Sequence, residues 1–185
     1  GNLYYHANHA MAATNIDVVG ALTLAGAPVT TVVSDSVTGI YAMTGVPGGS
    51  AWVVDPRRTY VGAQPHITIQ RGVSSTDATW IQDFLVGNRV FSGNQQLAGD
   101  VTGNGGIASL DATRIQEWRV GNLTRFAVSV NCNSDWVFVP IPGPDGSPTP
   151  AAPVIGPGTN CVHGSIQYAG LSADAAAQDF DGILF

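Results

Sequence analysis

The segment from residue 100 to residue 111, DVTGNGGIASLD, constrains this chain more than any other. Oxygen-bearing side chains stand at its positions 1, 3, 5 and 12, namely Asp100, Thr102, Asn104 and Asp111. A calcium ion takes about six to eight oxygen ligands, and a loop of this length surrounds it only by turning sharply near its middle. Gly105, at position 6, suits that turn because it lacks a Cβ. The spacing predicts a Ca²⁺ loop in which Gly106 adds its carbonyl and a water fills the position of Ala108.

A near-copy of the segment that follows this loop lies upstream. Residues 75–88 match residues 109–122, with nine identities at an offset of 34 residues. Such self-similarity indicates a repeated structural unit. We expect helices over 75–86 and 109–120, ended by Gly87 and Gly121, with Ser75 or Thr76 capping the first. The side chains expected to form the core between the helices are Trp80, Ile81, Phe84, Leu85, Ile115, Trp118 and Val120.

The first copy keeps few of the oxygen ligands. Counting back from Asp77 as position 12 places Gln70 at position 5 and Arg71 where the turn glycine should be. Two interpretations stay open for this segment. It is either a second, weak site that uses Gln70, Asp77 and backbone carbonyls, or a metal-free structural copy.

The repeat resembles a known family of modules. Position 12 is Asp111 rather than the longer Glu, and the helix that leaves the loop is the evident one. With the duplication, this pattern is similar to the paired loop–helix repeats of dockerin type I modules. The resemblance implies calcium binding over residues 65–125. It also implies that Ser75–Thr76 and Ser109–Leu110 occupy the positions that contact a cohesin-type receptor.

The first 64 residues have the pattern of short strands separated by turns. Strands are expected over 3–5, 16–22, 29–34, 41–44 and 51–55, between Gly, Pro, Asn and Asp residues. The motifs Ser34-Asp35, Gly39-Ile40-Tyr41 and Gly45-Val46-Pro47-Gly48-Gly49 resemble the turns of carboxypeptidase regulatory-like sandwiches. The resemblance implies an immunoglobulin-like, prealbumin-like β-sandwich over residues 1–64.

Residues 126–185 return to a strand pattern and are expected to pack on the preceding parts. Strands are expected over 126–130, 136–141, 165–168 and 180–185, with a Pro/Gly-rich loop over 142–159. The whole chain is therefore expected to be mainly β, with an embedded dockerin-like pair and C-terminal strands. Cys132 and Cys161 flank the loop without a zinc-like spacing, so a disulfide is favoured over two free buried thiols.

Composition excludes several classes of function. The chain has no lysine and a net charge of −6, which argues against nucleic-acid binding. We find no nucleophile elbow, phosphate loop or dinucleotide fingerprint, so we expect no enzyme. No apolar run approaches the length of a membrane span. A disulfide and a calcium site together favour an extracellular or cell-surface location, and the resemblances favour a bacterial source.

Both ends of the chain are apolar. The residues concerned are Leu3, Tyr4 and Tyr5 at one end and Ile183, Leu184 and Phe185 at the other. Such strands are either covered by their own sheet or donated to a neighbouring chain. The favoured function is a calcium-stabilised structural or adhesive protein, a subunit or repeat of a head-to-tail surface filament, and the sequence leaves glycan decoration open. The alternatives are a module that binds a cohesin-type receptor and a non-catalytic accessory domain of a secreted hydrolase.

Overall fold

The computed structural model describes residues 1–5, 8–12, 16–23, 26–46, 48–58, 72–157, 161–171 and 174–185. The chain forms two compact units and is mainly β, with several sheets and few helices. The first unit comprises Gly1–Arg58, Val137–Pro153 and His163–Ile183, and the second comprises Thr59–Trp136, Val154–Val162 and Leu184–Phe185. Residues 126–185, expected as one C-terminal part, are divided between the two units.

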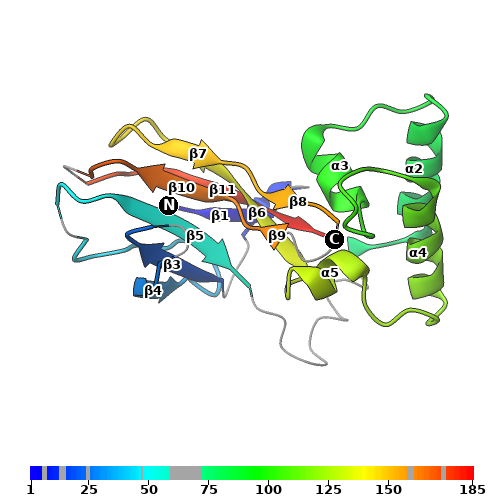
Figure 1. Ribbon diagram of the computed structural model, residues 1–185, viewed down its shortest axis with the longest axis horizontal. Coiled ribbons are helices and arrows are strands. Elements are labelled where there is room, and N and C mark those ends of the chain that lie inside the picture. The colour runs from blue at the N-terminus through cyan, green and yellow to red at the C-terminus, as the bar shows by residue number, and fades with distance from the viewer. Residues whose placement is uncertain are drawn as a thin grey trace. The chain divides into compact units, whose positions relative to one another are not determined.

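The first unit contains two sheets (Figure 1). A four-stranded sheet has the order β2 (Asn8–Ala12), β1 (Leu3–Tyr5), β11 (Gln178–Leu184) and β6 (Trp136–Pro142). A five-stranded sheet has the order β4 (Pro28–Val33), β3 (Asp17–Ala21), β5 (Trp52–Arg57), β10 (Ser165–Tyr168) and β7 (Thr149–Ala151). This arrangement is compatible with a β-sandwich.

The apolar end strands pair with each other inside the chain. β1 runs parallel to β11, with Leu3 opposite Phe180 and Tyr5 opposite Gly182. Leu3 and Phe180 are both completely buried. Of the two fates expected for these strands, coverage within their own sheet is the one observed. Large apolar side chains from both sheets are also fully or almost fully buried, among them Trp52, Phe138 and Ile166.

Most expected strands are present, with ends shifted by one or two residues. The strand over 165–168 coincides with β10, and 16–22, 29–34 and 51–55 correspond to β3, β4 and β5. The strand expected over 41–44 is wrong, because that segment has no regular secondary structure. β7 lies within the Pro/Gly-rich loop and pairs only at the sheet edge, where a proline is tolerated.

The second unit contains the repeat. Its helices are α2 (Ser75–Leu85), α3 (Gly93–Gly99), α4 (Ser109–Arg119) and α5 (Ala127–Asn131), and β8 (Val154–Ile155) pairs with β9 (Cys161–Val162). α2 and α4 lie side by side (Figure 1). Both end in the same way, since Gly87 and Gly121 have φ angles of 79° and 82°. Their N–H groups donate to Phe84 and Trp118 at the same distance of 3.1 Å. The repeat in the sequence is therefore also a repeat in local geometry.

The contact between the helices is narrower than expected. Ala78 and Ile81 of α2 and Ala112, Ile115 and Trp118 of α4 are buried. The expectation was wrong for Trp80, Leu85 and Val120, whose side chains are 38%, 42% and 72% exposed. Arg89 instead covers the Trp80 ring at 4.3 Å from its centroid. The Phe84 ring stacks on Phe91, outside the repeat, at a centroid distance of 4.8 Å.

Two further expectations about this unit were wrong. The segment expected as a strand over 126–130 lies mostly in helix α5, Ala127–Asn131, with Phe126 as its N-cap. The N-cap of α2 is Ser74 rather than Ser75 or Thr76, and its side chain accepts a hydrogen bond from the N–H of Thr76. α3 was not expected, and it supplies a short helix that enters the loop at Asp100.

Candidate metal centre

Asp100 organises the loop that begins at the end of α3. Its side chain is 3% exposed, and its two carboxylate oxygens accept hydrogen bonds from the N–H groups of Asn104 (3.1 Å) and Gly105 (2.7 Å). These bonds bend the loop back over the carboxylate. Gly105 has a φ of +91°, a left-handed conformation that favours glycine, as expected for position 6.

Asp111 closes the loop from the first turn of α4. It is completely buried, and one carboxylate oxygen accepts from the N–H of Ala108 at 2.9 Å. Its other oxygen accepts from the N–H of Thr102, also at 2.9 Å. One side chain therefore both caps the helix and faces the loop.

The two carboxylates meet at a single hydroxyl. The Oγ1 of Thr102 lies 3.2 Å from an oxygen of Asp100 and 2.9 Å from an oxygen of Asp111. A hydroxyl carries one proton, so it donates to only one of these oxygens at a time. Neither carboxylate has an ion-pair partner within the part of the chain that the structure describes. Three oxygens with two negative charges thus converge, an arrangement that suits a hard cation.

The remaining expected ligands lie at the open side of the loop. Asn104 and Gly106 are exposed, and the Asn104 side-chain oxygen accepts from the Gly106 N–H at 3.1 Å. Ile107, at position 8, forms no β-bridge. The structure therefore brings half-buried Thr102 together with the buried Asp100 and Asp111, and leaves Asn104 and Gly106 at the surface.

The loop rests on two elements that the sequence did not connect with it. The N–H of Val128 in α5 donates to the carbonyl of Val101 at 3.2 Å. Gly103 has a φ of +68°, and a Cβ there would lie 3.2 Å from the Cα of Val128. A Cβ on Gly105 would lie 3.6 Å from the carbonyl oxygen of Ile155 in β8. In the sequence, this close packing is indicated by the two glycines, Gly103 and Gly105, which are separated by one residue.

A disulfide joins these two supports. Cys132, which caps α5, is bonded to Cys161 in β9, the strand that pairs with β8. The predicted disulfide is confirmed. It closes a segment with a sequence separation of 29 residues and ties both elements behind the loop to each other.

The first copy of the loop is only partly described. Gln70, along with His66, Thr68 and Arg71, lies outside the described residues. Asp77 accepts from both the N–H and the hydroxyl of Ser74, at 2.7 and 2.9 Å. It therefore caps α2 as Asp111 caps α4, which is a structural role that needs no metal.

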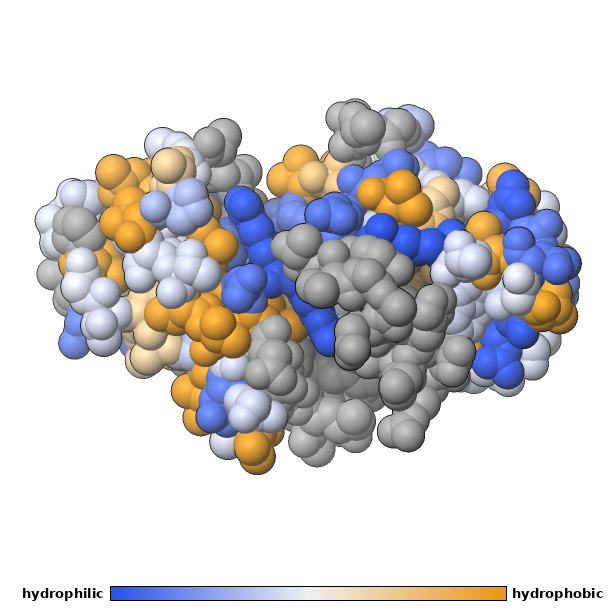
Figure 2. Space-filling view, turned by 90° about the horizontal axis from the view of Figure 1, so that it is seen from below, coloured by the Kyte–Doolittle hydropathy of each residue, from blue (hydrophilic) through white to orange (hydrophobic). Residues whose placement is uncertain are grey.

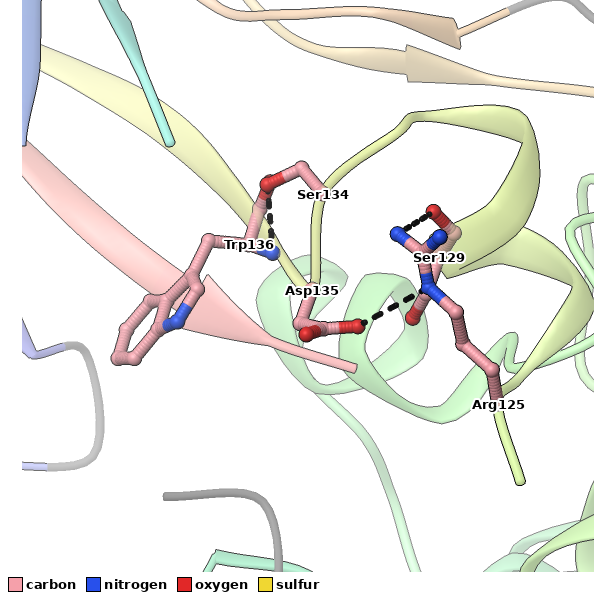
Figure 3. A network of polar contacts seen from close by, with 5 residues as sticks. All are labelled: Arg125, Ser129, Ser134, Asp135 and Trp136. Atoms are coloured by element: carbon pink, nitrogen blue, oxygen red, sulfur yellow. Dashed lines mark hydrogen bonds and ion pairs between the residues drawn. The ribbon is translucent and has the colours of Figure 1, made fainter. Parts of the chain in front are cut away.

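An ion pair between a half-buried arginine and a buried aspartate supports the chain beyond α4 (Figure 3). The Nε of Arg125 lies 3.7 Å from a carboxylate oxygen of Asp135, and its Nη2 donates to the Ser129 carbonyl at 2.6 Å. The Ser134 hydroxyl accepts from the Trp136 N–H at 3.0 Å. The Asp135 carbonyl accepts from the N–H of Phe185 at 3.1 Å. Sequence reasoning missed this network because its members are not arranged in any motif.

Comparisons with known proteins identify no relative. No protein-family model, curated protein sequence or solved structure matches this chain. Among the described residues, no group of three or more His, Cys, Asp and Glu side chains is placed to hold a metal. The loop differs from such a group because only two of its candidate ligands are acidic. In the described part of the chain, no helix has the length and apolarity needed to cross a membrane.

Proposed function

We propose that this chain is a calcium-stabilised structural protein that works outside the cell. The observation that carries this proposal is the convergence of Asp100, Thr102 and Asp111 around one point of the loop. The Asn104 side chain, the Gly106 carbonyl and a water at Ala108 would complete the ligand set. The ion would supply positive charge between the two buried carboxylates.

The donor set favours calcium over other common metals. Every candidate ligand is an oxygen, whereas structural zinc sites are built from cysteine and histidine side chains. Two carboxylates and several neutral oxygens form a site of low charge. Extracellular calcium modules bind with dissociation constants of about 10⁻⁴–10⁻³ M, which suits such a site. The disulfide also favours an oxidising compartment.

The ligands come from the end of α3, the loop and the first turn of α4. An ion bound there would join these elements and stabilise the folded chain by mass action, because the unfolded chain does not hold the ligands together. We assign the ion a structural role, and the protein a non-enzymatic one.

The first experiment compares Asp100→Asn with the wild type in calcium and in chelator. At a calcium concentration about 100 times the dissociation constant, binding adds about 2.7 kcal/mol to the free energy of unfolding. The wild type should therefore melt several degrees higher in calcium, and Asp100→Asn should lose this increment. Asp17→Asn, which removes the same charge from an exposed position in β3, is the matched control and should keep it. Equal calcium increments in all three proteins would contradict the proposal.

We further propose that the protein self-associates into a surface filament. What supports this is β4, which lies at the edge of the five-stranded sheet with Val29 and Val33 53% and 59% exposed. An edge strand presents unpaired N–H and C=O groups that another strand can satisfy. On the described part of the face in Figure 2, hydrophobic residues lie in separate groups among hydrophilic ones.

Electron microscopy of the protein with calcium and after chelation tests the assembly. Long fibres in calcium that shorten or loosen in chelator are the expected result. Val29→Lys in β4 should reduce fibre length, because a charge on an edge strand opposes pairing. Discrete single particles under both conditions would exclude the filament while leaving calcium stabilisation to be judged by melting.

A docking module is the second candidate. Ser75 and Thr76 at the start of α2 and Ser109 and Leu110 at the start of α4 are all exposed, as a receptor contact requires. Pull-down with a panel of cohesin domains tests this function. Retention that is lost in Ser109→Arg and kept in Asp17→Asn would support the docking module.

A further inference from the structure

Asn104 is the one asparagine in the sequence of this chain that is followed by glycine. Both Asn104 and Gly105 are exposed, so water reaches the peptide bond between them. Gly105 has no Cβ that would hinder an atom approaching its nitrogen. That nitrogen can form a five-membered ring with the side-chain amide carbon, Cγ, of Asn104. The pair is therefore chemically suited to a reaction of the chain with itself.

The Asn104 side chain is folded back along the main chain that follows it. Its Oδ1 accepts a hydrogen bond from the N–H of Gly106 at 3.1 Å. An asparagine bonded in this way to the residue two positions later closes a turn through its own side chain. The nitrogen of Gly105 is part of the ring that this hydrogen bond closes. The bond also withdraws electrons from the amide oxygen, which makes Cγ easier to attack.

A carboxylate restrains the nitrogen that would attack. The N–H of Gly105 donates to Oδ2 of Asp100 at 2.7 Å, and the N–H of Asn104 donates to Oδ1 of the same side chain at 3.1 Å. To attack Cγ, the Gly105 nitrogen must give up its proton, and this loss places negative charge beside the Asp100 carboxylate. Like charges so close together disfavour each other. The side chain that organises the loop therefore also slows the reaction.

We propose that Asn104 deamidates spontaneously in the folded protein, at a rate that the Asp100 carboxylate limits. The nitrogen of Gly105 bonds to Cγ of Asn104, and the bond between Cγ and the side-chain nitrogen breaks. The side-chain NH₂ group takes the proton of the Gly105 nitrogen and leaves as ammonia. Water then opens the cyclic imide on one side or the other. The products are an aspartate at residue 104 and an isoaspartate in which the main chain runs through the former side chain.

Either product changes the loop at one of its candidate ligands. The aspartate product adds a third carboxylate to those of Asp100 and Asp111. The isoaspartate product lengthens the main chain just before Gly105, whose φ of +91° shapes the turn. The proposal itself does not rest on calcium binding, because every contact in it lies within the chain.

The experiment incubates the full chain in chelator, in mildly alkaline buffer at physiological temperature, for several weeks. The chain is then cut at its arginines, and mass spectrometry with fragmentation locates each modified residue. Asn104 should show the mass change that replacement of NH₂ by OH produces, in two products that chromatography separates. Asn88 and Asn122 are exposed but are not followed by glycine, so they serve as controls within the same molecule and should stay intact.

Asp100→Ala tests the restraint on the Gly105 nitrogen. This variant should deamidate at Asn104 faster by about tenfold or more, the factor that corresponds to one hydrogen bond to a charged group. Ser74→Ala weakens the same unit at the N-cap of α2 and controls for a general loss of stability. It should react at nearly the rate of the wild type, because it leaves the bond from Gly105 to Asp100 in place.

The proposal is overturned if Asn104 stays intact in the wild type, or if Asn88 or Asn122 reacts as fast as Asn104. It is also overturned if Asp100→Ala reacts no faster than the wild type, or no faster than Ser74→Ala.

Discussion

At the scale of single residues, buried carboxylates are stabilised in two different ways. In the second unit, Asp100 and Asp111 are buried with hydrogen-bond donors around them and share a hydroxyl. In the first unit, Asp55 is 4% exposed and bonded to Arg57, whose Nε and Nη2 lie 2.8 and 2.7 Å from one carboxylate oxygen. The pair Asp100 and Asp111 suits a metal ion. At Asp55, the Arg57 guanidinium already supplies the positive charge.

We expect His163, which interacts with that ion pair, to make the stability of the chain depend on pH. Burial lowers its pKa from the ordinary value of 6.5, the charge of Asp55 raises it in part, and Arg57 lowers it further. As the pH falls through 6.5, the unfolded chain gains a proton at this residue that the folded chain does not. Proton binding therefore favours unfolding, and stability falls as the pH drops from about 7 toward 5.

His163→Gln should flatten this slope. The measurement is the midpoint of chemical unfolding at several pH values between about 5 and 7.5, where histidines titrate. Asp55 acts in the opposite direction at lower pH, because burial raises its pKa above 3.8 although Arg57 offsets part of that rise. Wild type and variant are therefore compared only in this higher pH range. Identical slopes for wild type and variant would show that His163 is not the group responsible.

At the scale of elements, the two helices of the repeat differ in one cap. α2 has Ser74 at its N-cap, with a side chain that accepts from Thr76, whereas α4 has Ala108 and no side-chain cap. In both helices the N–H of the N-cap residue donates to the carboxylate of the aspartate three residues later, at 2.7 Å in α2 and 2.9 Å in α4. The N-cap position is therefore filled by a favourable capping residue, serine, in α2 and by an unfavourable one, alanine, in α4.

Exchanging these residues gives a matched test of the repeat. A serine cap is worth about 1 kcal/mol relative to alanine, so Ser74→Ala should destabilise by that amount and Ala108→Ser should stabilise by a similar amount. Unfolding in chelator isolates the capping effect from any effect on calcium binding. Destabilisation by Ala108→Ser would show that the two helix starts are not equivalent.

The sequence predicted those features of the fold that depend on residues close together in the chain. Gly87 and Gly121 end their helices because of their own backbone conformation. The ends of both repeated helices could therefore be predicted from the sequence. Residues 126–130, FAVSV, have β-branched side chains and were expected as a strand. Residues 127–130 instead belong to α5, because the burial of Val128 against the loop and the disulfide at Cys132 override that preference.

The candidate site follows the same rule. The ligand spacing of the loop is local and was predicted, and Asp100, Thr102 and Asp111 do converge. The support from Val128 and Ile155 could not be predicted, because it depends on segments distant in the sequence that only the folded chain brings together. The parallel pairing of β1 with β11 could not be predicted from the sequence either, because no turn connects the two strands.

At the scale of the whole molecule, the disulfide connects the stability of the chain with the candidate metal site. Cys132–Cys161 constrains a segment of the unfolded chain with a sequence separation of 29 residues. Loops of this size contribute about 3–4 kcal/mol in the chain-entropy treatment. The bond also holds α5 and β8 behind the loop, so reduction should act on calcium affinity as well as on stability.

Reducing the protein, or replacing both cysteines by serine, should therefore have two effects. The melting temperature in chelator should fall, and calcium should bind more weakly by calorimetry because the loop loses its support at Val128 and Ile155. The Asp100→Asn variant separates them, since its reduction should lower stability with no calcium binding left to weaken. A reduced protein that melts lower and yet binds calcium as tightly as the oxidised one would show that the loop is preorganised by its own hydrogen bonds. The disulfide would then stabilise the second unit without shaping the candidate metal site.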